Sequence, residues 1–151
     1  MIKALATSFL ISVIVFILDQ ATKYYIKAHI GFFDVIRVTP FFYIVYSENT
    51  GSAFGMFKSL GIYFFIFVSI AAVVFLTVLI VRDGGNRIAY SLLLGGAAGN
   101  LLDRAVFGYV VDFLDFYIGS YHWPAFNVAD SALTVGIAFL FVKTIRGNRG
   151  N

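Results

Sequence analysis

The chain contains no cysteine, which excludes disulfides, thiolate nucleophiles and cysteine-ligated metals. Histidine is nearly as scarce, with only His29 and His122 in the sequence, and no group of histidines and carboxylates has the spacing of a metal site. Charged residues make up 13% of the 151 residues, about half the share in an ordinary soluble domain. The basic residues form no stripe that would follow a phosphate backbone. We therefore expect no metal, no cofactor and no nucleic-acid partner.

Apolar residues are abundant instead, at 60% of the chain, and they gather in four segments over residues 4–18, 62–81, 88–102 and 128–145. A helix needs about 20 apolar residues to cross a bilayer. The second segment meets this length, and the others meet it when their polar ends lie among the lipid headgroups. The sequence thus predicts an all-α membrane protein, a single integral membrane domain over 1–151 with spans at about 4–20, 62–81, 88–104 and 128–145. Glycines and alanines at 95–99 predict a central helix that its neighbours approach closely.

The ends of the first segment bear on whether it stays in the protein. Lys3 followed by an apolar run is also typical of a secretory signal peptide. No small-residue cleavage site follows, and the run ends in the polar residues Asp19 to Lys23. We expect a retained first span.

Basic residues predict the orientation of the spans, because short cytoplasmic flanks are enriched in lysine and arginine. With both termini cytoplasmic, six of the eleven basic residues fall in short stretches on the inner side: Lys3, Arg82, Arg87, Lys143, Arg146 and Arg149. Seven of the eight acidic residues then fall on the outer side: Asp19, Asp34, Glu48, Asp103, Asp112, Asp115 and Asp130. This asymmetry predicts a functional site that opens outward.

The first outer loop, about residues 23–60, is rich in aromatic and β-branched residues. The runs 32–39 and 41–46 flank Pro40 and predict two short strands. Such apolar strands beside a membrane lie on its surface or bind an apolar group; the alternative is that they only cap the helix bundle.

Two carboxyls are the leading candidates for chemistry. Asp112 is flanked by Val111 and Phe113 in the loop before the fourth segment, and Asp130 begins that segment. An ionisable residue at a bilayer edge is costly and indicates a functional site. Two neighbouring carboxyls share one proton, which suits acid–base catalysis. Asp115 rivals Asp112 on spacing alone, and the sequence leaves open which carboxyl is protonated, because such a pair titrates as a unit.

Other polar residues allow structural as well as functional interpretations. Asp19 and Lys23 have the i, i+4 spacing of a helical ion pair, and we expect Asp103 to pair with Arg104. Asn127 is a natural helix N-cap. Gly51 and Gly55 in the turn 49–55 would let backbone approach a ligand, or would form an ordinary re-entrant turn. Ser52 has no evident basic partner, and we expect His122 to be an interfacial residue rather than a metal ligand.

Five blocks taken together resemble the motifs of bacterial lipoprotein signal peptidases (signal peptidase II): Asp19–Lys23, Asn49–Phe54, Gly99–Arg104, Val111–Phe113 and Phe126–Asp130. One departure is Ser52, where the family often has alanine. The resemblance implies a four-transmembrane-helix bundle with a small extracytoplasmic β-cradle and a short periplasmic helix. It also implies an aspartic endopeptidase of the bacterial inner membrane that cleaves prolipoproteins before the lipid-modified cysteine.

The resemblance assigns the catalytic pair to Asp112 and Asp130 and so favours Asp112 over Asp115. It implies supporting roles for Asp19, Lys23, Asn49, Gly51, Asn100, Asp103, Arg104, Asn127 and Ala129. It implies lipid-modified prolipoproteins, membrane lipids and globomycin-type inhibitors as partners, and a site near the periplasmic face. Two other classes remain in competition: a proton- or ion-coupled membrane subunit that uses the same carboxyls, and a scaffold subunit of a larger complex.

Overall fold

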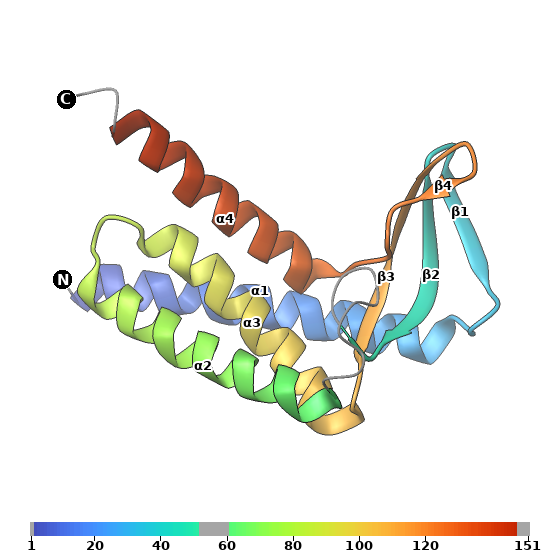
Figure 1. Cartoon of the computed structure of the whole chain (residues 1–151), viewed down its shortest axis with the longest axis horizontal. Helices are drawn as coiled ribbons and strands as arrows, with labels where there is room; N and C mark the ends of the chain where they lie inside the picture. The colour runs from blue at the N-terminus through green and yellow to red at the C-terminus, as the bar shows by residue number, and fades with distance from the viewer. Residues whose placement is uncertain (1, 52–60, 148–151) are drawn as a thin grey trace.

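Four helices run side by side and carry a small sheet at one end (Figure 1). This computed structural model describes residues 2–51 and 61–147. In chain order the elements are α1 (Ile2–His29), β1 (Val35–Thr39), β2 (Phe42–Asn49), α2 (Gly61–Arg82), α3 (Arg87–Phe107), β3 (Val110–Ile118), β4 (Tyr121–His122) and α4 (Val128–Gly147). Helix α1 begins, and α4 ends, at the end of the bundle opposite the sheet.

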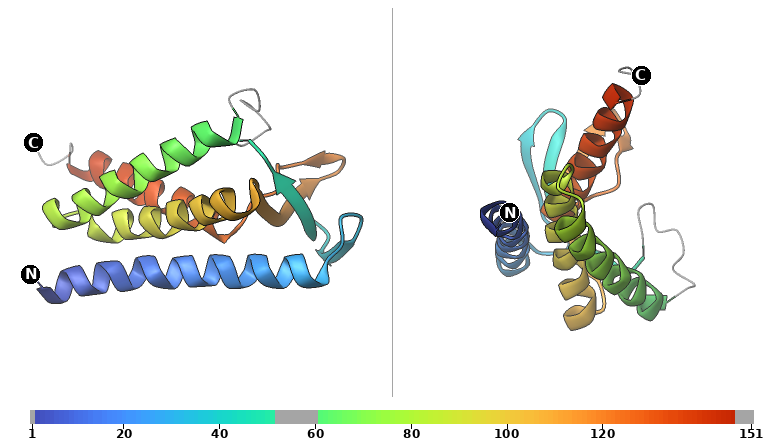
Figure 2. Two further views of the ribbon diagram at one scale, coloured as in Figure 1. Left: turned by 90° about the horizontal axis from the view of Figure 1, so that it is seen from below. Right: turned by 90° about the vertical axis from the view of Figure 1, so that its left-hand side faces the viewer.

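Helix α3 lies at the centre of the bundle, and each of the other three helices packs mainly against it (Figure 2). Its close packing depends on the predicted glycines. A Cβ on Gly95 would lie 2.6 Å from the Ser12 carbonyl oxygen, and one on Gly96 would lie 2.5 Å from that of Ala129. The prediction of a central helix with small residues is therefore confirmed.

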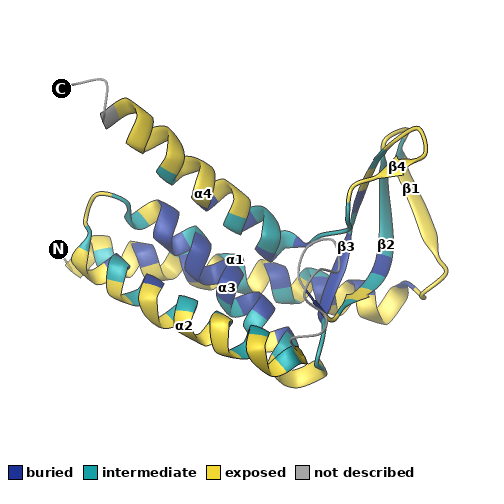
Figure 3. Ribbon diagram, in the orientation of Figure 1, coloured by how far each residue is buried: buried dark blue, intermediate teal, exposed yellow. Residues whose placement is uncertain are grey.

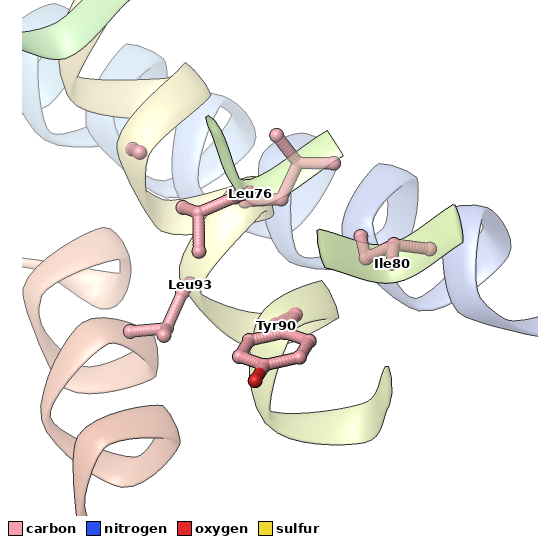
Figure 4. Close-up of a cluster of buried hydrophobic side chains, with 6 residues drawn as sticks. Leu76, Ile80, Tyr90 and Leu93 are labelled. Carbon is pink, nitrogen blue, oxygen red and sulfur yellow. The ribbon is translucent and has the colours of Figure 1, made fainter. Parts of the chain in front are cut away.

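Helix α3 is more deeply buried than the three helices around it. Buried residues concentrate on α3, whereas the outward faces of α1, α2 and α4 are exposed (Figure 3). These faces carry large apolar side chains such as Leu10, Phe67 and Phe141, which suits contact with lipid rather than water. Between α2 and α3 the core includes Leu76, Ile80, Tyr90 and Leu93 (Figure 4).

Three of the described helices are long and apolar enough to cross a membrane: α1, α2 and α4 over Val128–Arg146. Helix α3 has 21 residues, a comparable length. It does not qualify on composition, because its sequence includes Ser91, Asn100, Asp103 and Arg104 among its apolar residues.

The sheet is antiparallel with strand order β1-β2-β3-β4. Strands β1 and β2 flank Pro40, as the runs 32–39 and 41–46 predict. A second core cluster, which includes Ile26, Val111 and Phe113, joins the sheet to the end of α1.

Two expectations need correction. Asp112 lies in β3 rather than in a loop, because Val110, Val111 and Asp112 itself are buried and pair with β2. The first outer loop begins later than the expected residue 23, because α1 continues to His29, with Lys23 and Ile26 buried against the rest of the protein. No short helix occurs among residues 2–51 and 61–147, so the periplasmic helix implied by the resemblance stays a prediction.

Candidate active site

Asp112 on β3 and Asp130 on α4 line one pocket of about 840 Å³ at the junction of the sheet and the bundle. Two amide side chains connect them. The Asn127 Nδ2 donates to Asp112 Oδ1 over 2.7 Å, and the Asn100 Nδ2 donates to Asp130 Oδ1 over 2.8 Å. Asn127 Nδ2 also lies 3.3 Å from Asn100 Oδ1. The sequence segments that end α3, form β3 and begin α4 thus meet around the two carboxyls.

The surrounding contacts fix the orientation of both amides. Asn127 caps α4, because its Oδ1 accepts from the Asp130 backbone N–H over 2.9 Å, and its amide nitrogen must then face Asp112. Asn100 Oδ1 accepts from Lys23 Nζ over 2.9 Å, so its amide nitrogen faces Asp130. The predicted N-cap is confirmed, and the same side chain also binds the Asp112 carboxyl.

The environment of Asp112 favours its protonated form. Its side chain is 2% exposed. Burial, followed by the nearby charge of Asp130, raises the pKa of Asp112 from 3.8 to about 7. Hydrogen bonds from Asn49 and Asn127 and the charge of Lys23 oppose this shift without cancelling it. The raised pKa therefore lets this carboxyl keep its proton at a pH where an exposed aspartate would be ionised.

Beneath the pocket lies a buried group, which we call the lysine cluster, made of Asp19, Lys23 and Asp103. The Lys23 Nζ lies 2.8 Å from Asp19 Oδ2 and 3.0 Å from Asp103 Oδ2. With Asn100 as its third acceptor, all three hydrogens of the ammonium have partners. Complete pairing of this kind is what allows charges to be buried.

Each carboxylate of the lysine cluster also binds the backbone next to one of the pocket carboxyls. Asp103 Oδ2 accepts from the Val111 N–H over 3.1 Å, one residue before Asp112. Asp19 Oδ1 accepts from the Ala129 N–H over 2.8 Å, one residue before Asp130. The lysine cluster therefore fixes the backbone on both sides of the site.

The turn after β2 and the end of α3 complete the pocket wall. Asn49 Nδ2 donates to Asp112 Oδ2 over 2.9 Å, and Asn49 Oδ1 accepts from the Gly51 N–H over 3.0 Å. Arg104 lines the pocket and contacts the Gly51 and Asn100 carbonyls at 3.5 and 3.4 Å. Its Nε is buried, and it has no hydrogen-bond partner within the described residues.

The structure brings all nine supporting residues to this region, but it changes one expected pairing. Asp103 forms its ion pair with Lys23 instead of Arg104, while the Asp19–Lys23 pair is as predicted. Asp115 lies apart from the pocket wall and pairs with His122, whose Nδ1 is 2.8 Å from Asp115 Oδ2. Ser52 lies outside the described residues.

Sequence reasoning gave no role to Gln20, whose Nε2 contacts Asp19 and Asp103. Its position between Asp19 and Lys23 in the first motif was the only signal. Over residues 2–51 and 61–147, no group of three or more histidine, aspartate or glutamate side chains is arranged to hold a metal ion. The pocket instead offers two carboxyls, one with a raised pKa, in a partly apolar setting. Such a pair can activate water and donate a proton.

Comparison with known proteins defines the class to which this fold and site belong. A solved structure described as a bacterial membrane enzyme matches with a TM-score of 0.89 and 36% identity, over 97% of this chain and 92% of that one. A second structure with the same description matches with a TM-score of 0.82 and 38% identity, over 92% of each chain. The architecture is thus that of a membrane enzyme.

Sequence comparison then identifies the family. The model of the signal peptidase (SPase) II family matches residues 11–146. The lipoprotein signal peptidase of Thermodesulfovibrio yellowstonii is 43% identical, over 88% of this chain and 90% of that protein. That of Serratia marcescens is 44% identical, over 88% of this chain and 81% of that protein. The chain belongs to the signal peptidase II family of peptidases.

Proposed function

We propose that this protein is an intramembrane aspartic endopeptidase that removes signal peptides from diacylglyceryl-modified prolipoproteins by cleaving before the lipidated cysteine. Asp112 and Asp130 act as the general acid–base pair. The observation that carries the proposal is that these two carboxyls share one pocket and are joined through Asn127 and Asn100. Membership of the signal peptidase II family supplies the substrate class.

In the proposed mechanism, Asp112 begins protonated and Asp130 begins ionised. The raised pKa of Asp112 supports the first assignment. The position of Asp130 in the first turn of α4 supports the second, because a helix N-terminus stabilises negative charge. Asp130 takes a proton from water, the water oxygen attacks the scissile carbonyl carbon, and Asp112 gives its proton to the carbonyl oxygen.

Collapse of the tetrahedral intermediate reverses these transfers. The hydroxyl formed on the former carbonyl oxygen returns its proton to Asp112, the C–N bond breaks, and Asp130 protonates the leaving nitrogen. The products are a carboxylic acid on the signal peptide and a free amine on the lipidated cysteine. Charge stays within the pair throughout, and the chemistry proceeds without a covalent intermediate.

The supporting residues hold this pair in position. Asn100 and Asn127 orient the two carboxyls, and Asn49 with Gly51 fixes the far oxygen of Asp112. The lysine cluster and the Ala129 N–H fix the backbone beneath. Arg104 places a cation on the pocket wall, where it can face the substrate or an inhibitor of the globomycin type.

In the membrane, we propose a single domain with four spans, in which α3 crosses inside the ring of α1, α2 and α4. Its polar residues are compatible with lipid because they face other helices, and Asn100 and Asp103 are buried. Both termini are then cytoplasmic, and the site lies near the periplasmic face of the bacterial inner membrane. Acyl chains of the substrate remain in the outer leaflet beside it.

Replacement of each carboxyl tests the proposal. Purified Asp112→Asn and Asp130→Asn variants in liposomes are expected to lose at least about 10⁴-fold in cleavage of a lipidated precursor. Asp115→Asn is the matched control on the same strand and is expected to keep most of its activity, since Asp115 pairs with His122 outside the pocket. Wild-type cleavage should be insensitive to chelators.

Full activity in either pocket variant removes that residue from the mechanism. Failure of the wild-type protein to cleave any lipidated precursor, with proton flux in liposomes that requires the same carboxyls, would favour a proton-coupled subunit instead.

A further inference from the structure

Gln20 makes three polar contacts at the base of the site. Its Nε2 lies 3.0 Å from Asp103 Oδ1, 3.2 Å from Asp19 Oδ2 and 3.2 Å from the Gly99 carbonyl oxygen. A primary amide has two hydrogens, so these three acceptors share them. Gln20, on α1, thereby binds both carboxylates of the lysine cluster and the backbone of α3.

The two carboxylates depend on Gln20 to different degrees. Asp19 Oδ2 accepts from both Lys23 and Gln20, and its Oδ1 accepts from the Ala129 N–H. Asp103 Oδ2 accepts from Lys23 and from the Val111 N–H. Within the part of the chain that the structure describes, the one donor to Asp103 Oδ1 is Gln20. Loss of this donor would leave a buried carboxylate oxygen unpaired, which is costly.

We propose that Gln20 is a positioning residue, which holds Asp103 in the orientation that binds the Val111 N–H and so places Asp112 in the pocket. This inference rests on the proposed function. The path is short, since Gln20 contacts Asp103, Asp103 contacts Val111, and Val111 precedes Asp112 in β3. Asp130 is affected less, because Asp19 keeps the donors Lys23 and Ala129.

The neutral charge of Gln20 is part of this role. The lysine cluster combines two carboxylates with one ammonium. An amide adds hydrogen bonds there without changing the charge near Asp112. A glutamate of the same shape would bring a third negative charge and would turn a donor into an acceptor beside Asp103.

The test measures kcat and KM separately for cleavage of a lipidated precursor. Gln20→Met keeps the volume and removes the donor; kcat is expected to fall on the order of 10- to 100-fold, with KM unchanged. Gln20→Glu keeps the shape and is expected to lose more. Thr22→Val is the matched control on the same helix turn, because among the described residues the Thr22 hydroxyl bonds only to the backbone of α1. It should retain wild-type activity.

A double-mutant cycle shows whether Gln20 acts through Asp103. In the Asp103→Asn background, Gln20→Met is expected to add little further loss. Wild-type kcat in Gln20→Met or Gln20→Glu overturns the inference, as does full additivity with Asp103→Asn or a loss confined to thermal stability and KM. Because Asp112→Asn is assayed alongside, failure of this inference is separable from failure of the proposed function.

Discussion

At the scale of a single residue, the burial of Asp112 links folding to pH. The pKa of this carboxyl rises from 3.8 to about 7 on folding, so the folded protein binds the proton more tightly than the unfolded chain. The stabilisation is fully present below about pH 4 and is lost as pH rises through about 7. The difference between these two pKa values limits this stabilisation of the folded protein to about 4 kcal/mol.

This linkage predicts a pH-dependent difference between the wild-type protein and Asp112→Asn, which cannot titrate at this position. From pH 4 to pH 8 the unfolding temperature of the wild type should fall relative to that of the variant. Scanning fluorimetry in detergent across this range measures the difference. A difference that stays constant, or that grows in favour of the wild type as pH rises, contradicts the raised pKa.

Sequence alone identified the residues of the site better than it identified their contacts. Residue type and position along the spans pointed to Asp112, Asp130 and the Asp19–Lys23 pair. Spacing could not assign Asp103 to Lys23 rather than Arg104, because this pairing depends on how α1 packs against α3. For the same reason spacing alone left Asp115 as a rival to Asp112, whereas the sheet places it beside His122.

At the scale of elements, the close approach of α1 and α3 sets the position of the lysine cluster. A Cβ on Gly99 would overlap Asp19 Oδ2. Gly99→Ala should therefore displace Asp19 and weaken its bond to the Ala129 N–H, even though alanine is the better helix former by about 1 kcal/mol. Cleavage is expected to fall on the order of 100-fold, as for other small displacements near a reacting group.

Activity and unfolding temperature of the purified variant check this expectation. Gly84→Ala is the matched control, because the atoms nearest to a Cβ there belong to the flexible Arg87 side chain, at an ordinary 3.7 Å. Unchanged activity in Gly99→Ala would mean that the two helices can separate without disturbing the site.

Helices and strands could be predicted where one class of residue continues over a long run of the sequence. Long apolar runs gave α2 and α4, and aromatic, β-branched runs beside Pro40 gave β1 and β2. Strand β3 was missed, because Asp112 and Asp115 interrupt its apolar residues, and no local signal shows which strand they pair with. Their pairing with β2 is a contact between segments far apart in sequence. Gly108 ends α3 in the left-handed conformation, at φ 79°, two residues before β3 begins.

At the scale of the whole molecule, the number of membrane crossings depends on α3. Hydropathy alone qualifies α1, α2 and α4, since α3 carries Asn100, Asp103 and Arg104 among its apolar residues. A sequence criterion treats each helix as if it faced lipid, whereas α3 buries its polar side chains against its neighbours. The bundle as a whole, and not the composition of α3, therefore determines whether α3 can span the bilayer.

The proposed four-span topology predicts opposite sides for the two ends of α3. The chain has no cysteine, so single-cysteine variants can be labelled without background. Gly84→Cys marks the turn before α3, and Tyr121→Cys marks an exposed position in the sheet after it, 84% accessible. In intact spheroplasts, a membrane-impermeant maleimide should label only the cysteine at 121, and the one at 84 should react after permeabilisation. Labelling of both from outside would show that α3 does not cross, and would leave α4 as the third and last span.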